Sequence, residues 1–196
     1  MTGVQTCALR SIDKILAELD INDDTLVAGL LHDVVEDTEY TMVELVADFG
    51  QEVALLVDDV TKLGALVFEN KETRQAENLR KMFLAMSKDI RVLIIKLADR
   101  LHNLRTINYM SEKKIQDKCQ ETIDIYAPLA SRLGMYNMKF ELEDTAMKHL
   151  YPEEYKDIGS KFNARKDECD QIISGIINEI KKALDDMGIE YTVKGR

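Results

Sequence analysis

At 196 residues, with 45% hydrophobic residues and only 2 prolines, the chain is long enough to bury the core of a large, ordered, helix-rich domain. Its formal net charge of −10 argues against unspecific binding to nucleic acid or to an anionic membrane, which needs a basic surface. A phosphorylated small molecule is not excluded, because a bound metal or a few basic side chains can override the overall charge locally.

The cysteines and the hydropathy indicate a cytoplasmic protein. Cys7, Cys119 and Cys169 are scattered along the chain and lack the spacing of a metal site. They are typical of free thiols in a reducing compartment. No apolar run reaches the length that a membrane-spanning helix needs.

The first residues differ from the rest of the chain. Residues 1–11 fit neither a signal peptide nor the start of a helix, because they lack an apolar core. They resemble a translated sequencing adapter, and we interpret them as a non-native leader. The domain itself is expected to begin at Ile12.

Apolar residues recur with helical spacing along most of the remaining chain. The predicted helices cover residues 12–19, 25–36, 41–50, 51–63, 71–87, 90–107, 111–125, 137–151 and 152–188. Thr41 and Glu44 form a capping-box pattern, and Asp89 is an N-cap candidate. Gly50 is a stop signal between two of these helices.

Two further features concern the C-terminal half. Pro128 either kinks a helix or begins a new one, because it lacks a backbone N–H. Residues 190–194 have the composition of a β-strand. The predicted fold class is therefore all-α, ending in the first strand of a second domain.

A first polar cluster lies in the predicted helix 25–36 and its end, at His32, Asp33, Glu36 and Asp37. In one continuous helix, His32 and Glu36 would share a face, and so would Asp33 and Asp37. The neighbouring residues are apolar, and unpaired charge is costly to bury. The cluster therefore needs a cation, a polar network or water, and a divalent metal is the simplest single answer.

A second polar cluster lies in the predicted helix 90–107. Asp99, Asn103 and Thr106 stand at i, i+4 and i+7 and so line one face. A carboxylate, an amide and a hydroxyl there are typical of one metal ligand beside two hydrogen-bonding groups. Joining this Asp99 to His32 and Asp33 gives the arrangement of an HD-type metal site. Mixed imidazole and carboxylate donors suit Mn²⁺ or another divalent first-row metal.

Five blocks in this order resemble the hydrolase domain of the RelA/SpoT family. They are His32–Thr38 (HDVVEDT), Val60–Leu63 (VTKL), Gln75–Met82 (QAENLRKM), Lys96–Thr106 (KLADRLHNLRT) and Tyr126–Gly134 (YAPLASRLG). A lone His-Asp pair is weak evidence, whereas five ordered blocks are specific. The resemblance runs from about residue 12 to the C-terminus.

The resemblance implies an HD-domain helical bundle and a Mn²⁺-dependent enzyme that removes the 3′-pyrophosphate of the alarmone (p)ppGpp. It implies metal ligands (His32, Asp33, Asp99), catalytic groups that orient and activate the attacking water (Glu36, Asp37) and nucleotide contacts (Asn103, Thr106). The substrate partner is thus a small guanosine nucleotide, with neither nucleic acid nor membrane expected.

The resemblance also implies a domain organisation. Residues 12–135 would form the hydrolase core, and residues 136–188 would be helices that lead toward a synthetase domain. Residues 189–196 would be the start of that domain, which is truncated here together with the regulatory domains of the parent protein.

One departure from the family matters. The family's first metal-ligand histidine falls at about Ala8, inside the suspect leader. The basic residues that hold the guanine base have no counterpart in this chain. Loss of a ligand or its support typically costs tenfold to a hundredfold in affinity or activity. We therefore expect the parent protein to hydrolyse (p)ppGpp and this fragment to be impaired.

Two other functions stay open, namely another HD-domain nucleotide phosphohydrolase and a catalytically inactive regulatory or interaction module. Purely structural interpretations also exist for single residues. Asn103 would then be a packing or capping amide, and Thr106 would bond back to its own helical turn. His102 lies off the face that Asp99 and Asn103 share, which favours a supporting or structural role.

Overall fold

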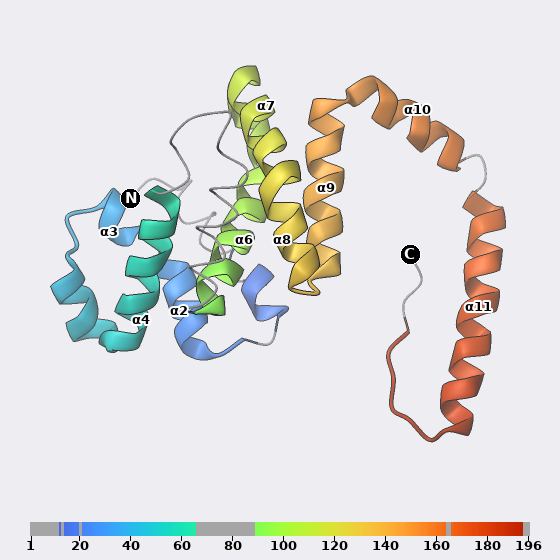
Figure 1. Ribbon diagram of the computed structural model, residues 1–196, viewed down its shortest axis with the longest axis horizontal. Coiled ribbons are helices and arrows are strands. Elements are labelled where there is room, and N and C mark those ends of the chain that lie inside the picture. Colours follow the sequence, from blue (N-terminus) through green and yellow to red (C-terminus); the bar gives the residue numbers. More distant parts are fainter. Residues whose placement is uncertain (1–11, 13, 20, 66–88, 164–165, 194–196) are drawn as a thin grey trace. The chain divides into compact units, whose positions relative to one another are not determined.

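The computed structural model describes residues 12, 14–19, 21–65, 89–163 and 166–193 (Figure 1). The chain divides into two compact units, Met1–Leu150 and Tyr151–Arg196. Residues 12 and 14–17 are helical. The other elements are α2 (Asp23–Leu31), α3 (Val34–Asp37), α4 (Met42–Ala65), α6 (Ile90–Arg105), η1 (Ile107–Tyr109), α7 (Glu112–Glu121), η2 (Thr122–Tyr126), α8 (Ala127–Arg132), α9 (Tyr136–Leu150), α10 (Pro152–Asn163) and α11 (Lys166–Asp186). The predicted all-α class is confirmed.

Local capping signals fix where several helices begin. The Thr41 N–H donates to the Glu44 carboxylate (2.8 Å), and the Glu44 N–H donates to Thr41 Oγ1 (3.3 Å), which is a reciprocal capping box. The carboxylate of Asp89 accepts from the Arg91 N–H (2.9 Å) at the start of α6. Both predicted helix starts are confirmed.

Gly50 interrupts α4. Its backbone has φ 87° and ψ 166°, so the element consists of two helices that meet at a kink. This conformation is essentially restricted to glycine, because a Cβ atom would clash with the backbone. The predicted stop at Gly50 is thereby confirmed.

We expect Gly50→Ala to destabilise the protein by about 1–3 kcal/mol. Alanine is strained at this φ by its own local backbone, although a Cβ there would meet no other described residue within 4 Å. Thermal or urea unfolding followed by circular dichroism measures the loss. The control is Gly175→Ala in α11, where a Cβ also meets open space but the backbone is helical. That variant should gain helical stability. Equal stability of wild type and Gly50→Ala would contradict the strain argument.

Pro128 begins a new segment, which is one of the two outcomes predicted for it. The predicted helix 111–125 corresponds to α7 followed by one turn of π-helix, η2. The chain then continues into α8, whose first turn contains Pro128. In η2 the Ala127 N–H donates to the Thr122 carbonyl oxygen, five residues back. Pro128 has no backbone N–H and cannot donate an α-helical hydrogen bond. The π-helical turn therefore lies where the hydrogen bonding of a regular α-helix would be interrupted in any case.

The predicted helix 152–188 corresponds to two described helices, α10 and α11. Residues 164–165, which lie between them, are outside the described residues. The sequence between Phe162 and Ile172 contains no Ile, Leu, Val, Met or aromatic residue, so no apolar stripe joins the two helices.

The predicted strand at residues 190–194 is not confirmed. Residues 189–193 are irregular, and the described part of the chain holds no strand with which they could pair. The predicted helix 71–87 and the leader 1–11 lie outside the described residues.

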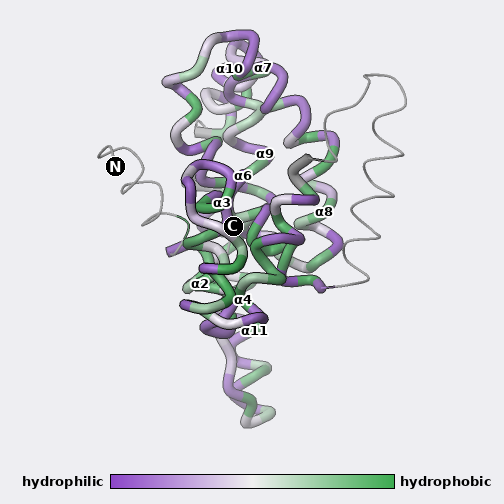
Figure 2. The backbone as a smooth tube through the Cα atoms, turned by 90° about the vertical axis from the view of Figure 1, so that its left-hand side faces the viewer, coloured by the Kyte–Doolittle hydropathy of each residue, from purple (hydrophilic) through white to green (hydrophobic). Residues whose placement is uncertain are grey.

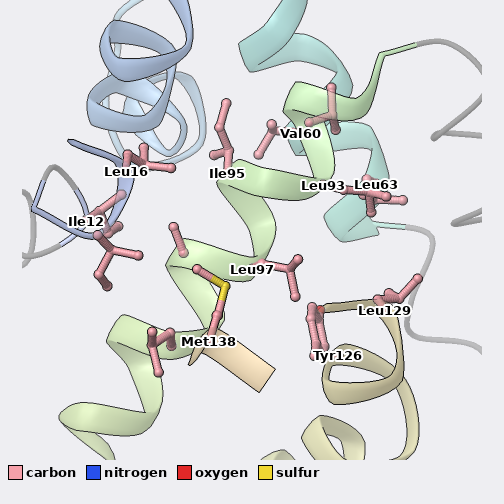
Figure 3. Close-up of a cluster of buried hydrophobic side chains, with 14 of the residues drawn as sticks. Ile12, Leu16, Val60, Leu63, Leu93, Ile95, Leu97, Tyr126, Leu129 and Met138 are labelled. Atoms are coloured by element: carbon pink, nitrogen blue, oxygen red, sulfur yellow. The ribbon is translucent and has the colours of Figure 1, made fainter. Parts of the chain in front are cut away.

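Helix α6 is the centre of the first unit. It contacts α2, α4, α9 and η2, and Leu93, Ile95 and Leu97 project from it into the core (Figure 3). Leu16, from the N-terminal helix, packs directly against Gly29 of α2, where a Cβ would lie 2.3 Å from Leu16 Cδ1. The absence of a side chain at Gly29 therefore allows the two helices to approach closely.

Helix α9 belongs to the first unit, because it packs on α6, α7, α8 and η2. The division of the structure thus falls after Leu150, whereas the boundary predicted at residue 135 concerns the extent of the hydrolase core and stays a prediction. In the second unit, α11 carries hydrophobic and hydrophilic residues in alternation (Figure 2), and Ile172 and Ile176 on it are exposed. None of the described helices is long and apolar enough to cross a membrane.

Candidate metal centre

The His32–Asp33 dipeptide forms a turn between α2 and α3. The prediction of one continuous helix through residues 25–36 is therefore wrong. The physical reason is a side-chain cap: His32 Nδ1 lies 2.8 Å from the carbonyl oxygen of Gly29. The ring thus satisfies a carbonyl group that the end of α2 would otherwise leave without a partner.

The turn changes how the first polar cluster is presented. His32 is 4% exposed, whereas Asp33, Glu36 and Asp37 are all exposed. The backbone remains tight, since the Asp37 N–H donates to the Asp33 carbonyl oxygen at 2.8 Å. His32 is therefore a buried imidazole, and the three carboxylates that follow it lie at the surface. The helix faces predicted to be shared by His32 with Glu36 and by Asp33 with Asp37 do not form.

The cap also decides which ring nitrogen of His32 carries hydrogen. A carbonyl oxygen can only accept, so Nδ1 must be the donor to Gly29. In the neutral ring, Nε2 then holds the free lone pair. This is the usual state of a histidine that ligates a metal, whose other nitrogen donates to a backbone carbonyl or a carboxylate.

Two carboxylates approach the Nε2 atom of His32. Nε2 lies 2.9 Å from Asp33 Oδ2 and 3.7 Å from Asp99 Oδ1. Asp99 belongs to α6, 67 residues after His32. Nε2 is buried and makes no hydrogen bond of acceptable geometry with any residue that the structure describes. Burial lowers the pKa of His32, but Asp33 and Asp99 together raise it more, to about 10. Without a metal, His32 is thus a buried cation between two acids.

Asp99 is held on both of its oxygens. Asn103 Nδ2 donates to Oδ1 (2.8 Å), and Lys96 Nζ lies 3.9 Å from Oδ2. Burial raises the pKa of Asp99, but His32 and Lys96 bring it below its usual range. The carboxylate is therefore ionised and fixed in direction, as a metal ligand must be.

The donor set of His32, Asp33 and Asp99 has the chemistry of a divalent-metal site. Ligand atoms in neighbouring positions around such an ion lie about 3 Å apart, because each is about 2.1 Å from the metal. The 2.9 Å between His32 Nε2 and Asp33 Oδ2 matches this spacing, and the 3.7 Å to Asp99 Oδ1 is longer. Among the described residues, no group of three or more His, Cys, Asp or Glu is arranged to hold a metal ion as it stands. The three side chains have donor atoms suited to a divalent metal, but in this structure they form an ion pair between His32 and the two carboxylates.

The other predicted site residues lie around this centre. Glu36 and Asp37 are on α3, one turn after Asp33. Thr106 is the C-cap of α6 and not part of its helical face, and its Oγ1 lies 3.2 Å from the His102 carbonyl oxygen. His102 is buried with an Nδ1 atom that has no hydrogen-bond partner in the described structure.

Two supporting groups were missed from the sequence. The Gly29 carbonyl orients His32, and the Lys96 ammonium group faces Asp99. The spacing i, i+3 between Gly29 and His32 at a helix end is a signal that could have indicated the cap.

We expect Asn103→Ala to weaken binding of a divalent metal about tenfold, because Asp99 loses the hydrogen bond that directs it. Thr106→Val should change metal affinity less than twofold, since among the described residues Thr106 Oγ1 bonds only to carbonyl groups of its own helical turn. Calorimetric titration with Mn²⁺ measures both variants. An equal effect of the two substitutions would contradict a specific role of Asn103.

Comparison with known proteins shows the family of this chain. Residues 6–136 match the family described as HD domain. The chain belongs to this family. The HD domain here is 50% identical over 186 residues to a GTP pyrophosphokinase of Streptomyces coelicolor (95% of this chain, 22% of the relative). It is 45% identical over 182 residues to the bifunctional (p)ppGpp synthase/hydrolase SpoT of Escherichia coli (93% and 26%).

A third relative is the guanosine-3′,5′-bis(diphosphate) 3′-pyrophosphohydrolase of Vibrio cholerae, 45% identical over 186 residues (95% of this chain, 26% of the relative). The chain thus spans about a quarter of the length of these curated relatives. The resemblance to the RelA/SpoT family that the five sequence blocks predicted is confirmed by these matches. The histidine and aspartate at the α2–α3 turn of this HD domain are the pair around which its candidate metal centre is built.

Proposed function

We propose that this HD domain binds a divalent metal and contributes to removal of the 3′-pyrophosphate of (p)ppGpp. The observation that carries the proposal is the buried Nε2 atom of His32, which lies 2.9 Å from Asp33 Oδ2 and 3.7 Å from Asp99 Oδ1 and finds no hydrogen bond of acceptable geometry among the described residues. The names of the relatives support the substrate, since two of them are (p)ppGpp hydrolases by name.

The proposed metal ligands are His32, Asp33 and Asp99. Imidazole with carboxylate oxygens favours Mn²⁺ among the divalent ions. When bound, such an ion lowers the pKa of a water molecule and neutralises phosphate charge. Asp33 is 52% exposed, so its side chain is free to turn from the ion pair toward a ligand position.

The remaining roles fall to neighbouring side chains. Glu36 and Asp37 on α3 are exposed carboxylates that orient the attacking water and accept its proton. Asn103 donates to Asp99, and Thr106 is the C-cap of α6. Both are proposed to contact the nucleotide. The partner is a small guanosine nucleotide, and a cytoplasmic location remains a prediction.

The proposal includes reduced activity of this chain. The family's first ligand histidine corresponds to about Ala8, which lies outside the described residues. Alanine offers no donor atom, so the chain supplies three protein ligands where the family has four. We expect Mn²⁺ affinity and turnover to be at least about tenfold lower than in a relative with the complete set.

The test is a pyrophosphate-release assay with ppGpp and added Mn²⁺, in which the chain is compared with SpoT of Escherichia coli. Slow release that disappears in Asp99→Asn supports the proposal. Turnover equal to that of SpoT would refute the impairment. Hydrolysis of deoxynucleoside monophosphates or cyclic dinucleotides without ppGpp hydrolysis would favour another HD phosphohydrolase. Absence of any Mn²⁺-induced rise in Tm would indicate a non-catalytic module.

A further inference from the structure

A largely buried ionic cluster adjoins the candidate metal centre through α6. Arg100, the residue after Asp99 on α6, donates from Nη2 to Glu121 Oε2 at 2.7 Å. Its guanidinium carbon also lies 4.1 Å from the centre of the Tyr126 ring. The Arg100 side chain is 10% exposed and that of Glu121 21%. Arginine is therefore held on one side by a charge and on another by an aromatic face.

The π-helical turn η2 explains how two residues five apart meet one guanidinium. Glu121 directly precedes η2, and Tyr126 is its last residue. In an α-helix, residues five apart point in different directions. The i→i+5 turn of a π-helix is one residue wider, so residues five apart come to lie above one another. Single π-turns inside helices are frequent at functional sites.

Fixing Arg100 also fixes the rotation of α6 about its axis. Consecutive residues of an α-helix point about 100° apart, so the direction of one sets the direction of the next. With Arg100 held against α7 and η2, Asp99 is directed toward His32 from a different face of α6. The positive charge of Arg100 also acts on the Asp99 carboxylate.

We propose that Arg100, held by Glu121 and Tyr126 at the π-turn, is a positioning residue that sets the direction of the Asp99 carboxylate in the metal centre. This inference rests on the proposed function only in naming the metal. Its geometric content, which is that the Arg100 cluster determines how closely Asp99 approaches His32, stands on the contacts alone.

Lysine cannot replace arginine here without loss. It keeps the positive charge but has no planar fork, so it cannot hold Glu121 and lie flat on Tyr126 at once. Arg100→Lys therefore tests geometry at constant charge. Glu121→Gln is the companion variant, because its amide oxygen can still accept from Arg100 and leaves no empty space.

The matched control is Arg105→Lys on the same helix. Arg105 forms a two-pronged ion pair with Glu141 of α9, from Nε to Oε1 (2.6 Å) and from Nη2 to Oε2 (2.8 Å). That pair joins α6 to another helix, but it is more exposed and lies about 1.7 turns from Asp99. The Arg105→Lys variant therefore measures how much metal affinity and Tm change when any bidentate arginine contact between two helices is lost.

Two measurements are made on the complete 196-residue chain. The first is Mn²⁺ affinity by calorimetric titration, with Tm recorded for each variant. We expect Arg100→Lys to weaken binding about tenfold and Glu121→Gln to weaken it less, with no change in Arg105→Lys. The second is the imidazole nitrogen shifts of His32 in the metal-free chain, assigned with His32→Gln. These should move in Arg100→Lys and stay in place in Arg105→Lys.

The outcomes separate the two proposals. Lower Tm in Arg100→Lys with unchanged Mn²⁺ affinity and unchanged His32 shifts would overturn the positioning role and leave a structural one. If the wild-type chain binds no Mn²⁺, the proposed metal function fails, and the His32 shifts alone decide the inference. Movement of those shifts in Arg100→Lys but not in the control would then still support it.

Discussion

Replacing Asp99 by asparagine should reduce Mn²⁺ affinity by on the order of a hundredfold or more and abolish the rise in Tm that the metal causes. Asparagine keeps the size of the side chain and an oxygen that can accept from Asn103. It loses the negative charge, and charge is what balances a divalent ion in a site that is only partly exposed. Thermal unfolding with and without Mn²⁺ measures the effect.

The control for this variant is Asp157→Asn on α10. Asp157 is an exposed carboxylate that pairs with Lys161 in the same helix, and it belongs to the second unit. Its loss changes the net charge by the same amount, so Mn²⁺ binding should be unaffected. Undiminished Mn²⁺ stabilisation of Asp99→Asn would remove Asp99 from the metal centre.

The metal-free chain should lose stability as the pH rises, in contrast to a protein dominated by ionised carboxylates. The pKa of His32 is raised from 6.5 to about 10 in the folded state by Asp33 and Asp99, against the effect of burial. A group with a raised pKa stabilises the fold fully below its unfolded pKa. We therefore expect this contribution, several kcal/mol in size, to be present below about pH 6.5 and lost as the pH approaches 10.

Mn²⁺ should reverse this trend, because a ligating imidazole must give up its proton. The Tm increase caused by the metal is then larger at pH 8.5 than at pH 6.5. His32→Gln serves as the control, since it cannot titrate and should flatten the profile of the metal-free chain. A metal-free stability that rises between pH 6.5 and 9 would contradict the ion pair between His32 and the two carboxylates.

Local signals predicted the fold where the deciding contacts are local. The capping box at Thr41 and Glu44, the cap at Asp89 and the stop at Gly50 each depend on residues within one turn of the chain. For the same reason, the start of α9 after Gly134 was close to its predicted place. Such contacts join residues that are close in sequence, so residue type and spacing are enough to predict them.

Features that depend on distant contacts were not predictable in this way. The π-turn η2 has no marker in hydrophobic spacing, and its role became visible only through the contacts of Glu121 and Tyr126 with Arg100. Arg100 itself is charged, and an arginine on an amphipathic helix is normally solvated. Its burial is decided by partners about 20 residues away.

The candidate site falls between these cases. The residue types and their order identified His32, Asp33 and Asp99, and the structure brings these three together. The break at His32 was missed, because helical spacing alone continues through it while the ring bonds back to Gly29. The roles of Glu36, Asp37, Asn103 and Thr106 remain predictions for experiment.

The close approach of Leu16 to Gly29 couples two positions on consecutive helices. A methyl group at residue 29 needs the space that Leu16 Cδ1 occupies. Gly29→Ala alone should therefore push the N-terminal helix away from α2, at the residue whose carbonyl holds His32. Adding Leu16→Val shortens the opposing side chain and should restore part of the stability. Among HD domains of this kind, the two positions are expected to co-vary, with a larger residue at one accompanied by a smaller residue at the other.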